Sequence, residues 1–204
     1  MMGMEFQPVT LEGTHVRLEP LTLNHLDALC QVGLDPELWR WTPSIVRTPE
    51  EMRAYVETAL EWQMRGTALP FATVDRITGK VVGSTRFANI EKENRRLEIG
   101  WTWVARRWQR TPINTEAKYL MLRHAFETLG YIRVEFKTDS LNRQSQVALE
   151  RIGAREEGTL RNHMVTYNGR IRHSVYYSII DSEWPRVKAS LEERLSRPYD
   201  GKRD

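Results

Sequence analysis

The stretch from Glu98 to Lys118 constrains the fold more than any other part of this chain. An alternating apolar pattern at its start predicts a strand, a basic irregular turn follows, and an amphipathic helix pattern begins near Ile113. The first backbone N–H groups of a helix lack partners within the helix, and the helix dipole favours an anion at that end. A strand that enters a helix through such a turn therefore predicts a phosphate site. We interpret this turn as the holder of the pyrophosphate of a nucleotide-like cofactor.

The strand over residues 97–104 has a simple expected alternation. Successive side chains of a strand point to opposite faces of the sheet, so large apolar residues are expected on one face and smaller or polar residues on the other. The first set is Leu97, Ile99, Trp101 and Trp103, and the second is Glu98, Gly100, Thr102 and Val104.

Periodicity, helix caps and turn residues predict the remaining elements. Strands are expected at residues 15–21, 69–74, 81–88, 97–104, 132–138, 157–166 and 170–179, and helices at 22–33, 48–65, 113–129, 142–152 and 181–195. No internal repeat or low-complexity linker divides this order of elements. The sequence therefore predicts one mixed α/β domain.

The composition narrows the function classes. The 204 residues include 30 basic and 27 acidic side chains, so the net charge is +3, and the two signs are interspersed. That pattern is weak support for an anionic ligand and poor support for nucleic-acid binding. The lone Cys30 lies in an apolar helical context, which favours a buried structural thiol. No signal peptide or membrane-spanning run is apparent, so we expect a cytoplasmic enzyme or binding domain without membrane contact.

Several motifs occur together in one order along the chain. They include Glu98-Ile99-Gly100-Trp101, Asn114-Thr115-Glu116-Ala117-Lys118, Asn142-x-x-Ser145, Glu150-Arg151-Ile152-Gly153-Ala154 and Glu183-Trp184-Pro185. Together these motifs resemble the GCN5-related N-acetyltransferase superfamily, and most closely its ribosomal-protein N-acetyltransferase-like branch. The resemblance extends over residues 9–185.

The resemblance implies an α/β (α+β) fold in one domain over residues 9–196, followed by a polar tail at 197–204. Its central sheet would be mixed and mostly antiparallel, with about seven strands, splayed between strands 4 and 5 and flanked by helices. The implied enzyme is an N-acetyltransferase that moves an acetyl group from acetyl-CoA to a primary amine, such as a protein N-terminus. Direct attack in a ternary complex is the implied mechanism, and a homodimer is compatible with it.

The phosphate loop of the superfamily falls on Gln109, Pro112 and Asn114 in this sequence. Glycine is usual at the last two positions, so the chain departs from the pattern twice. Pro112 has no N–H to donate, although it is well suited to start a helix. Side chains that can supply compensating donors are Arg107, Arg110, Asn114 and Thr115.

The resemblance also assigns residues to the pantetheine arm. The backbone of strand residues 102–104 would pair with this arm like an added strand, and Asn142 would contact it with its side chain. Alternatively, Asn142 is only the N-cap of a helix, and the two roles are compatible. The full set of expected cofactor-binding residues is Thr102, Trp103, Val104, Gln109, Arg110, Thr111, Ile113, Asn114, Thr115 and Asn142.

Three residues are candidates for catalysis. A primary ammonium must lose a proton before it attacks a thioester, and Glu98 and Glu135 are carboxylates on strands that flank the implied cleft. The alternative for each is a solvated or salt-bridged strand carboxylate, since Arg96 and Arg133 are close in sequence, and attack through a water or without a base is a further alternative. Leu149 occupies the position where many superfamily members carry a tyrosine acid, so Ser145 is the expected substitute; a second capping hydroxyl is the alternative for Ser145.

Two other functions remain open at this level. The first is a catalytically degenerate module that binds CoA or a protein, which the departures at the phosphate loop and at Leu149 favour and the retained Asn142, Ser145 and Glu135 oppose. The second is a nucleic-acid binder, which rests on net charge and arginine-rich turns alone. The five histidines show no ligand spacing, so no metal site is expected.

Overall fold

The computed structural model describes residues 6–199, and its eight strands form one sheet. All neighbouring strands are antiparallel except β5 and β6, which are parallel. In sheet order the strands are β1 (Leu11–Glu12), β2 (Val16–Pro20), β3 (Leu69–Asp75), β4 (Val81–Glu91), β5 (Arg96–Val104), β6 (Arg133–Asp139), β8 (Ile171–Ile180) and β7 (Arg155–Val165). The expectation of about seven strands missed the two-residue β1.

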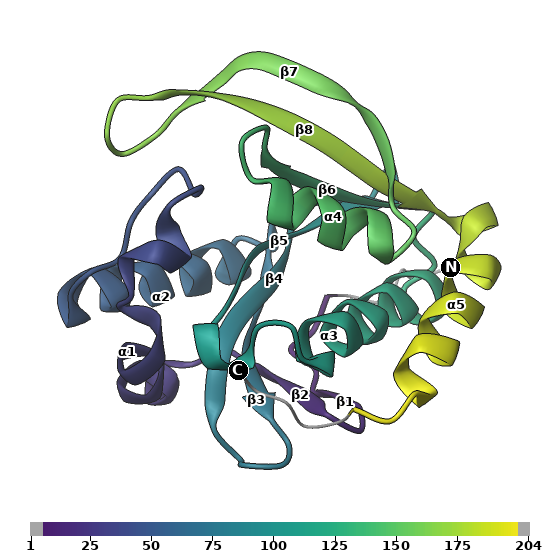
Figure 1. Cartoon of the computed structure of the whole chain (residues 1–204), viewed down its shortest axis with the longest axis horizontal. Helices are drawn as coiled ribbons and strands as arrows, with labels where there is room; N and C mark the ends of the chain where they lie inside the picture. The colour runs from purple at the N-terminus through teal and green to yellow at the C-terminus, as the bar shows by residue number, and fades with distance from the viewer. Residues whose placement is uncertain (1–5, 200–204) are drawn as a thin grey trace.

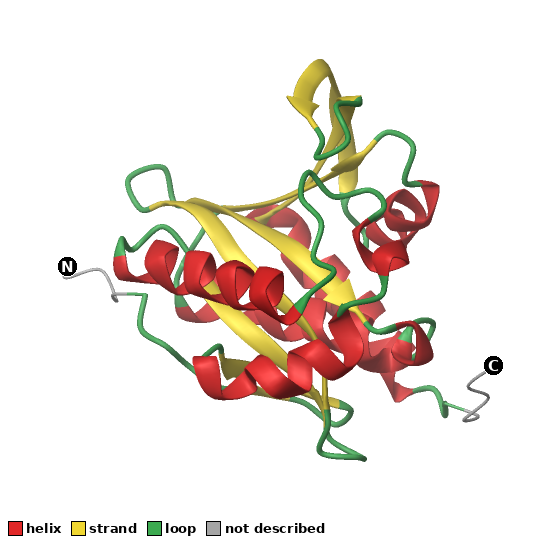
Figure 2. Cartoon of the chain, turned by 90° about the vertical axis from the view of Figure 1, so that its left-hand side faces the viewer, coloured by secondary structure: helices red, strands yellow, loops and turns green. Residues whose placement is uncertain are grey.

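Helices cover both faces of the sheet (Figures 1 and 2). They are α1 (Leu26–Gly33), α2 (Pro49–Met64), α3 (Pro112–Arg123), α4 (Arg143–Arg151) and α5 (Trp184–Ser196). A small core beneath α1 and α2 contains Leu29, Met52 and Trp103. A larger core on the opposite face joins α3, α4 and α5 to the strands, and it contains Ile99 and Phe136. The sheet therefore separates two apolar layers.

Caps and turns form where the sequence predicts them. Thr48 Oγ1 accepts the backbone N–H of Glu51 at 3.2 Å, and Pro49 is the first residue of α2. Asn142 Oδ1 accepts the N–H of Ser145 at 3.1 Å and so starts α4. The predicted helix over 22–33 differs in its first turn, because residues 23–25 form a 3-10 turn before α1.

The predicted alternation of β5 is wrong beyond Gly100. Trp101 has φ +49°, and in this region Thr85 of β4 opposes two residues of β5 instead of one. Such a β-bulge exchanges the two faces for the residues that follow it. Leu97 and Ile99 consequently share a core with Val104, whereas Trp103 packs beneath α1 and α2.

The expected splay lies between β5 and β6. The two strands pair at residues 96–98 of β5 and 133–135 of β6, and their pairing ends there. Beyond this point β6 continues with β8 as far as Asp139, and β5 continues with β4 as far as Val104. The strands that the sequence predicts as the fourth and fifth are β5 and β6 in the structure, because the short β1 adds one strand before them.

In the part of the chain that the structure describes, no helix combines the length and apolar character needed to span a bilayer.

Candidate active site

The open edge of β5 is the centre of the site. From Ile99 to Val104 this edge faces the gap that β6 leaves, so its backbone groups can pair with an extended ligand. The carbonyl of Trp101 already accepts a hydrogen bond from the Tyr55 hydroxyl at 3.3 Å. The geometry is that of an unfilled strand position.

The basic turn at the end of β5 leads directly into α3. Thr111 is the N-cap of α3, and its Oγ1 accepts the N–H of Ile113 at 3.4 Å. The side chain of Gln109 faces back and donates from Nε2 to the Val104 carbonyl at 2.9 Å. Arg107 and Arg110 are exposed, and neither forms an ion pair with a carboxylate of residues 6–199. Unpaired guanidinium groups beside a helix N-terminus suit a phosphorylated ligand.

The start of α4 adjoins this turn. Gln144 Nε2 lies 3.5 Å from Gln109 Oε1, which brings the N-terminal turn of α4 to the end of β5. Asn142 and Ser145 are both partly exposed there, and the amide group of Asn142 keeps its Nδ2 donor available beside its capping oxygen. The predicted cofactor residues of the turn and of α4 therefore lie around one end of the gap.

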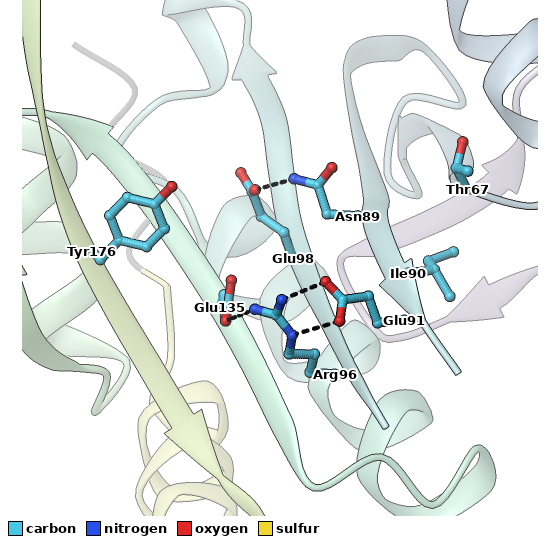
Figure 3. A pocket seen from close by; sticks show the side chains of 8 residues that line it. All are labelled: Thr67, Asn89, Ile90, Glu91, Arg96, Glu98, Glu135 and Tyr176. Carbon is cyan, nitrogen blue, oxygen red and sulfur yellow. Dashed lines mark hydrogen bonds and ion pairs between the residues drawn. The ribbon is translucent and has the colours of Figure 1, made fainter. Parts of the chain in front are cut away.

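A pocket of about 390 Å³ opens at the other end of the β5–β6 contact (Figure 3). Its lining residues are Thr67, Asn89, Ile90, Glu91, Arg96, Glu98, Glu135 and Tyr176. The strand registers align Glu98 with Glu135 and Glu135 with Ser178, so their side chains share one sheet face. This is the face of α1 and α2, since Val134 and Phe136 point into the opposite core.

Glu98 is a buried carboxylate in this pocket, with 3% of its surface exposed. Its Oε2 accepts a hydrogen bond from Asn89 Nδ2 at 2.7 Å and lies 3.2 Å from Lys137 Nζ. Gly100 makes this position possible, because a Cβ at residue 100 would lie 2.8 Å from Glu98 Oε1. Oε1 receives no hydrogen bond from the described residues, so one oxygen is available to accept a proton.

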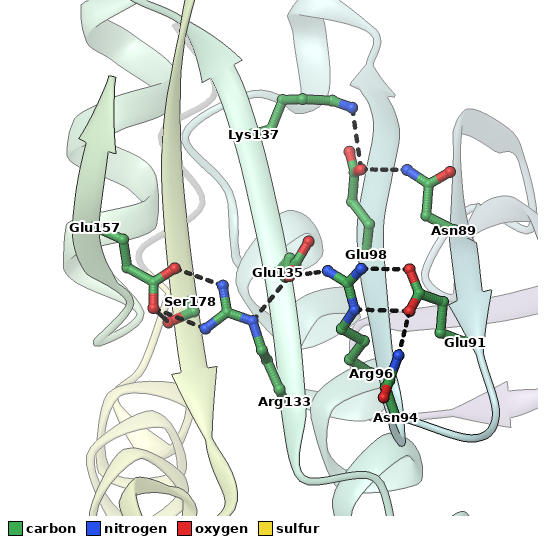
Figure 4. Close-up of polar contacts among 10 residues, drawn as sticks. All are labelled: Asn89, Glu91, Asn94, Arg96, Glu98, Arg133, Glu135, Lys137, Glu157 and Ser178. Carbon is green, nitrogen blue, oxygen red and sulfur yellow. Dashed lines mark hydrogen bonds and ion pairs between the residues drawn. The ribbon is translucent and has the colours of Figure 1, made fainter. Parts of the chain in front are cut away.

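Glu135 lies inside an ion-pair network (Figure 4). Its Oε1 receives Arg96 Nη1 at 2.9 Å and Arg133 Nε at 2.8 Å. Arg96 also binds Glu91, and Arg133 binds Glu157 through both terminal nitrogens. Hydrogen bonds to Glu91 and then to Glu135 raise the pKa of Arg96. The salt-bridged alternative therefore describes both carboxylates, since Glu135 pairs with two arginines and Glu98 pairs with Lys137.

Lys118 was not among the predicted site residues, yet its amine lies beneath the gap. The residue is 6% exposed, and its Nζ is 2.6 Å from Thr102 Oγ1 and 5.9 Å from the centre of the Phe136 ring. Burial lowers the pKa of Lys118 to about 7, an effect that the nearby Glu98 opposes. Such a buried amine is often found at functional sites.

The β7–β8 hairpin extends past the sheet towards the loop between α1 and α2 (Figure 1), and Tyr176 of β8 lines the pocket. The Tyr167 N–H donates to the Pro43 carbonyl at 2.8 Å, and Arg172 Nη1 lies 3.4 Å from the Trp41 carbonyl. The guanidinium of Arg170 stacks on the Trp41 ring at 5.6 Å and pairs with the buried Asp139. We call these contacts between residues 166–172 and 41–43 the hairpin latch.

Comparisons with known proteins agree with this geometry. The model of the Acetyltransferase (GNAT) domain matches residues 15–155, which is more than half of the chain. The chain belongs to the GCN5-related N-acetyltransferase family. Members of this family transfer an acetyl group from acetyl-CoA to an amine, so the chain is an acetyltransferase, and the resemblance seen in the sequence is confirmed.

Individual relatives cover almost the whole chain. A protein of Bacillus subtilis (strain 168) named "Putative ribosomal N-acetyltransferase YdaF" is 35% identical over 173 residues, which are 84% of this chain and 92% of that protein. The structure of a GCN5-related N-acetyltransferase from Brucella melitensis superposes with a TM-score of 0.87 at 32% identity, covering 98% of this chain and 91% of that one. RimJ of Mycobacterium smegmatis, solved with CoA-disulfide, shares the fold with a TM-score of 0.81 at 23% identity, covering 92% and 95% of the two chains.

The predicted site residues form two groups around the gap between β5 and β6. The open β5 edge, the basic turn and the start of α4 hold the residues predicted to bind the cofactor, and Ser145 lies with them. Glu98 and Glu135 line the pocket. Asn89 and Lys137, which hold Glu98, were not among the predicted residues. Lys137 follows Glu135 by two residues on the same strand face, and that spacing was a usable signal.

Proposed function

We propose that the acceptor of this acetyltransferase is the N-terminal amine of a protein, with a ribosomal protein as the first candidate. Two observations support this. The relative from Bacillus subtilis carries a ribosomal N-acetyltransferase name. The pocket contains the buried carboxylate of Glu98, and its Oε1, which receives no hydrogen bond from the described residues, can accept one from a primary ammonium. A ribosomal acceptor implies a cytoplasmic enzyme.

We assign acetyl-CoA to the gap between β5 and β6. The open edge from Thr102 to Val104 would hold the pantetheine, and Asn142 would donate to it from Nδ2. Arg107 and Arg110, with the amides of the first turn of α3, would hold the phosphates, and the remaining turn residues would shape this site. Bound there, acetyl-CoA supplies an activated acyl carbon. The fit rests on the unpaired guanidinium groups at the turn and on the missing strand partner.

We assign the proton chemistry to Glu98 and Ser145. Glu98 would accept the proton of the acceptor ammonium on Oε1, while Asn89 and Lys137 hold Oε2 in place. Ser145, at the first turn of α4, would relay to the departing sulfur the second proton, which the acceptor nitrogen loses as the C–S bond breaks. Glu135 would order the arginines of the pocket instead of acting as the base, because it forms ion pairs with two guanidinium groups, whereas Glu98 forms one ion pair, with Lys137.

The test compares acetylation of peptides with free and blocked N-termini, followed by mass spectrometry. Acetylation of free N-termini alone is the expected result. Glu98→Gln should lower kcat by about 10²–10⁴-fold, the usual contribution of a general base. Glu135→Gln is the matched control and should change kcat far less. Binding of acetyl-CoA without product from any peptide or amine would instead favour the degenerate module.

A further inference from the structure

Arg86 is a fully buried arginine in the middle of β4, with 1% of its surface exposed. Its Nε and Nη2 are buried and have no hydrogen-bond partner among residues 6–199. Burial of a guanidinium is costly unless other groups replace its solvent, and this one lies among aromatic rings. The environment therefore indicates that Arg86 has a specific structural role.

Three rings enclose the guanidinium. Its central carbon lies 4.9 Å from the ring centre of Tyr55, 5.4 Å from that of Trp62 and 5.3 Å from that of Trp101. Tyr55 and Trp62 are seven residues apart on α2, so they lie on one helix face. Trp62 and Trp101 also meet edge to face, with centres 5.2 Å apart at 82°. Arg86 thus links α2 to the bulged residue of β5.

The backbone of Trp101 has a conformation that needs such support. A φ of +49° is uncommon for a bulky side chain and persists where surrounding contacts impose it. Arg86 is the register partner of Gly100, directly before the bulge, and the Tyr55 hydroxyl binds the Trp101 carbonyl. Ring and carbonyl of Trp101 are therefore both held from α2 and β4.

We propose that Arg86 is a positioning residue for the acetyl-transfer site, which acts by holding Trp101 in its left-handed conformation. The bulge lies three residues beyond Glu98, where pairing of β5 with β6 ends, so it sets the course of the open edge. Without the guanidinium, Trp101 relaxes to an extended conformation and the edge loses its alignment. This inference rests on the proposed CoA site for its effect on binding, but not for its effect on Trp101.

The first test is spectroscopic and needs no ligand. The ¹³Cα and ¹³Cβ chemical shifts of Trp101 report its backbone conformation, and they are compared in the full chain, in Arg86→Met and in Arg86→Lys. Arg53→Met, at an exposed arginine of α2, is the matched control. We expect left-handed shifts in the full chain and in the control, and extended shifts in Arg86→Met. Left-handed shifts in a folded Arg86→Met variant overturn the proposal.

The second test measures CoA binding by calorimetry. Arg86→Met should weaken CoA binding at least ten-fold, with Arg53→Met unchanged. In a Trp101→Gly background the same substitution should weaken it less than two-fold, because glycine adopts a positive φ without support. An equal loss in both backgrounds contradicts the positioning role. If Arg86→Met does not fold, Arg86→Lys, which also lacks the guanidinium, replaces it, and unchanged Trp101 shifts with unchanged CoA binding then overturn the proposal.

The two proposals fail in different ways. A full chain that does not bind CoA refutes the assigned cofactor site, whereas the Trp101 shifts still decide the role of Arg86.

Discussion

Lys118 makes the stability of the protein depend on pH in a direction that can be calculated. Its pKa is 10.5 in an exposed chain and about 7 in the folded protein, where burial disfavours the ammonium. Between these two values the unfolded state binds more protons than the folded state. The free energy of unfolding therefore rises as the pH rises from 7 towards 10.5, and the penalty is complete below pH 7.

The magnitude follows from the same two values. Each pKa unit corresponds to about 1.4 kcal/mol, so the penalty below pH 7 is on the order of 5 kcal/mol. For a chain of this length about 1 kcal/mol moves Tm by roughly 2–4 °C. Lys118 should thus contribute a rise in Tm of about 3–5 °C per pH unit between pH 7 and 10.

Lys118→Met removes this contribution while keeping a side chain of similar volume. Thermal unfolding followed by circular dichroism from pH 6 to 10 should show that Tm of the variant minus Tm of the wild type is constant up to about pH 7 and then falls as the pH rises. Other groups that titrate in this range cancel in the difference. Lys92→Met, at an exposed lysine, should give a curve parallel to the wild type. A Lys118→Met curve that also runs parallel would refute a buried amine with a lowered pKa.

Three further predictions concern anchoring contacts. Glu116 accepts the backbone N–H groups of residues 14–16 at 2.6–2.8 Å, so Glu116→Ala should lower the free energy of unfolding by roughly 3 kcal/mol or more in urea titrations, and a change below about 1 kcal/mol would contradict the reasoning. Asn142→Asp keeps the capping oxygen but not the Nδ2 donor, so calorimetry should show weaker CoA binding at an unchanged Tm; unchanged binding would limit Asn142 to capping. Arg170→Ala removes the hairpin-latch contact with Trp41 and also the ion pair with Asp139, so KM for a peptide acceptor should rise several-fold while the Kd for CoA stays the same.

The order of strands and helices was predictable because each element carries its own local signal. Thr48 and Pro49 start α2, and Asn142 starts α4, through contacts within a few residues. The identity of the fold followed from the motifs between Glu98 and Pro185, whose order along the chain is far more specific than any one of them. These features depend on short-range physics or on comparison with known sequences.

The bulge at Trp101 was not predictable in this way. The apolar alternation of residues 97–104 is the one expected for a regular strand without a bulge. The positive φ of Trp101 depends on contacts with Tyr55 and Trp62, which lie about forty residues earlier in the chain. Tertiary contacts therefore determined which face of the sheet these side chains occupy, against the alternation of the sequence. The partners of Glu98 come from two other strands and were hidden for the same reason.

Lys118 had a signal in the sequence. It precedes Met121 and Leu122 by three and four residues, so it lies on the apolar stripe of the helix that follows the basic turn. A lysine on such a stripe is either buried or at the edge of the core. Its position beneath Thr102 could not be derived, because the packing of α3 against β5 sets it.

The hairpin latch also determines the point during translation at which the fold can be completed. It joins Trp41 to Arg172, which are 131 residues apart in the chain. A ribosome releases the chain from its N-terminus, so the loop at Trp41 emerges early and lacks its covering hairpin until β8 has followed. The contact of the hairpin with the loop at residues 41–43 is therefore among the last parts to form. A nascent chain that ends before residue 172 has the whole of β5 and α3 but no hairpin over that loop.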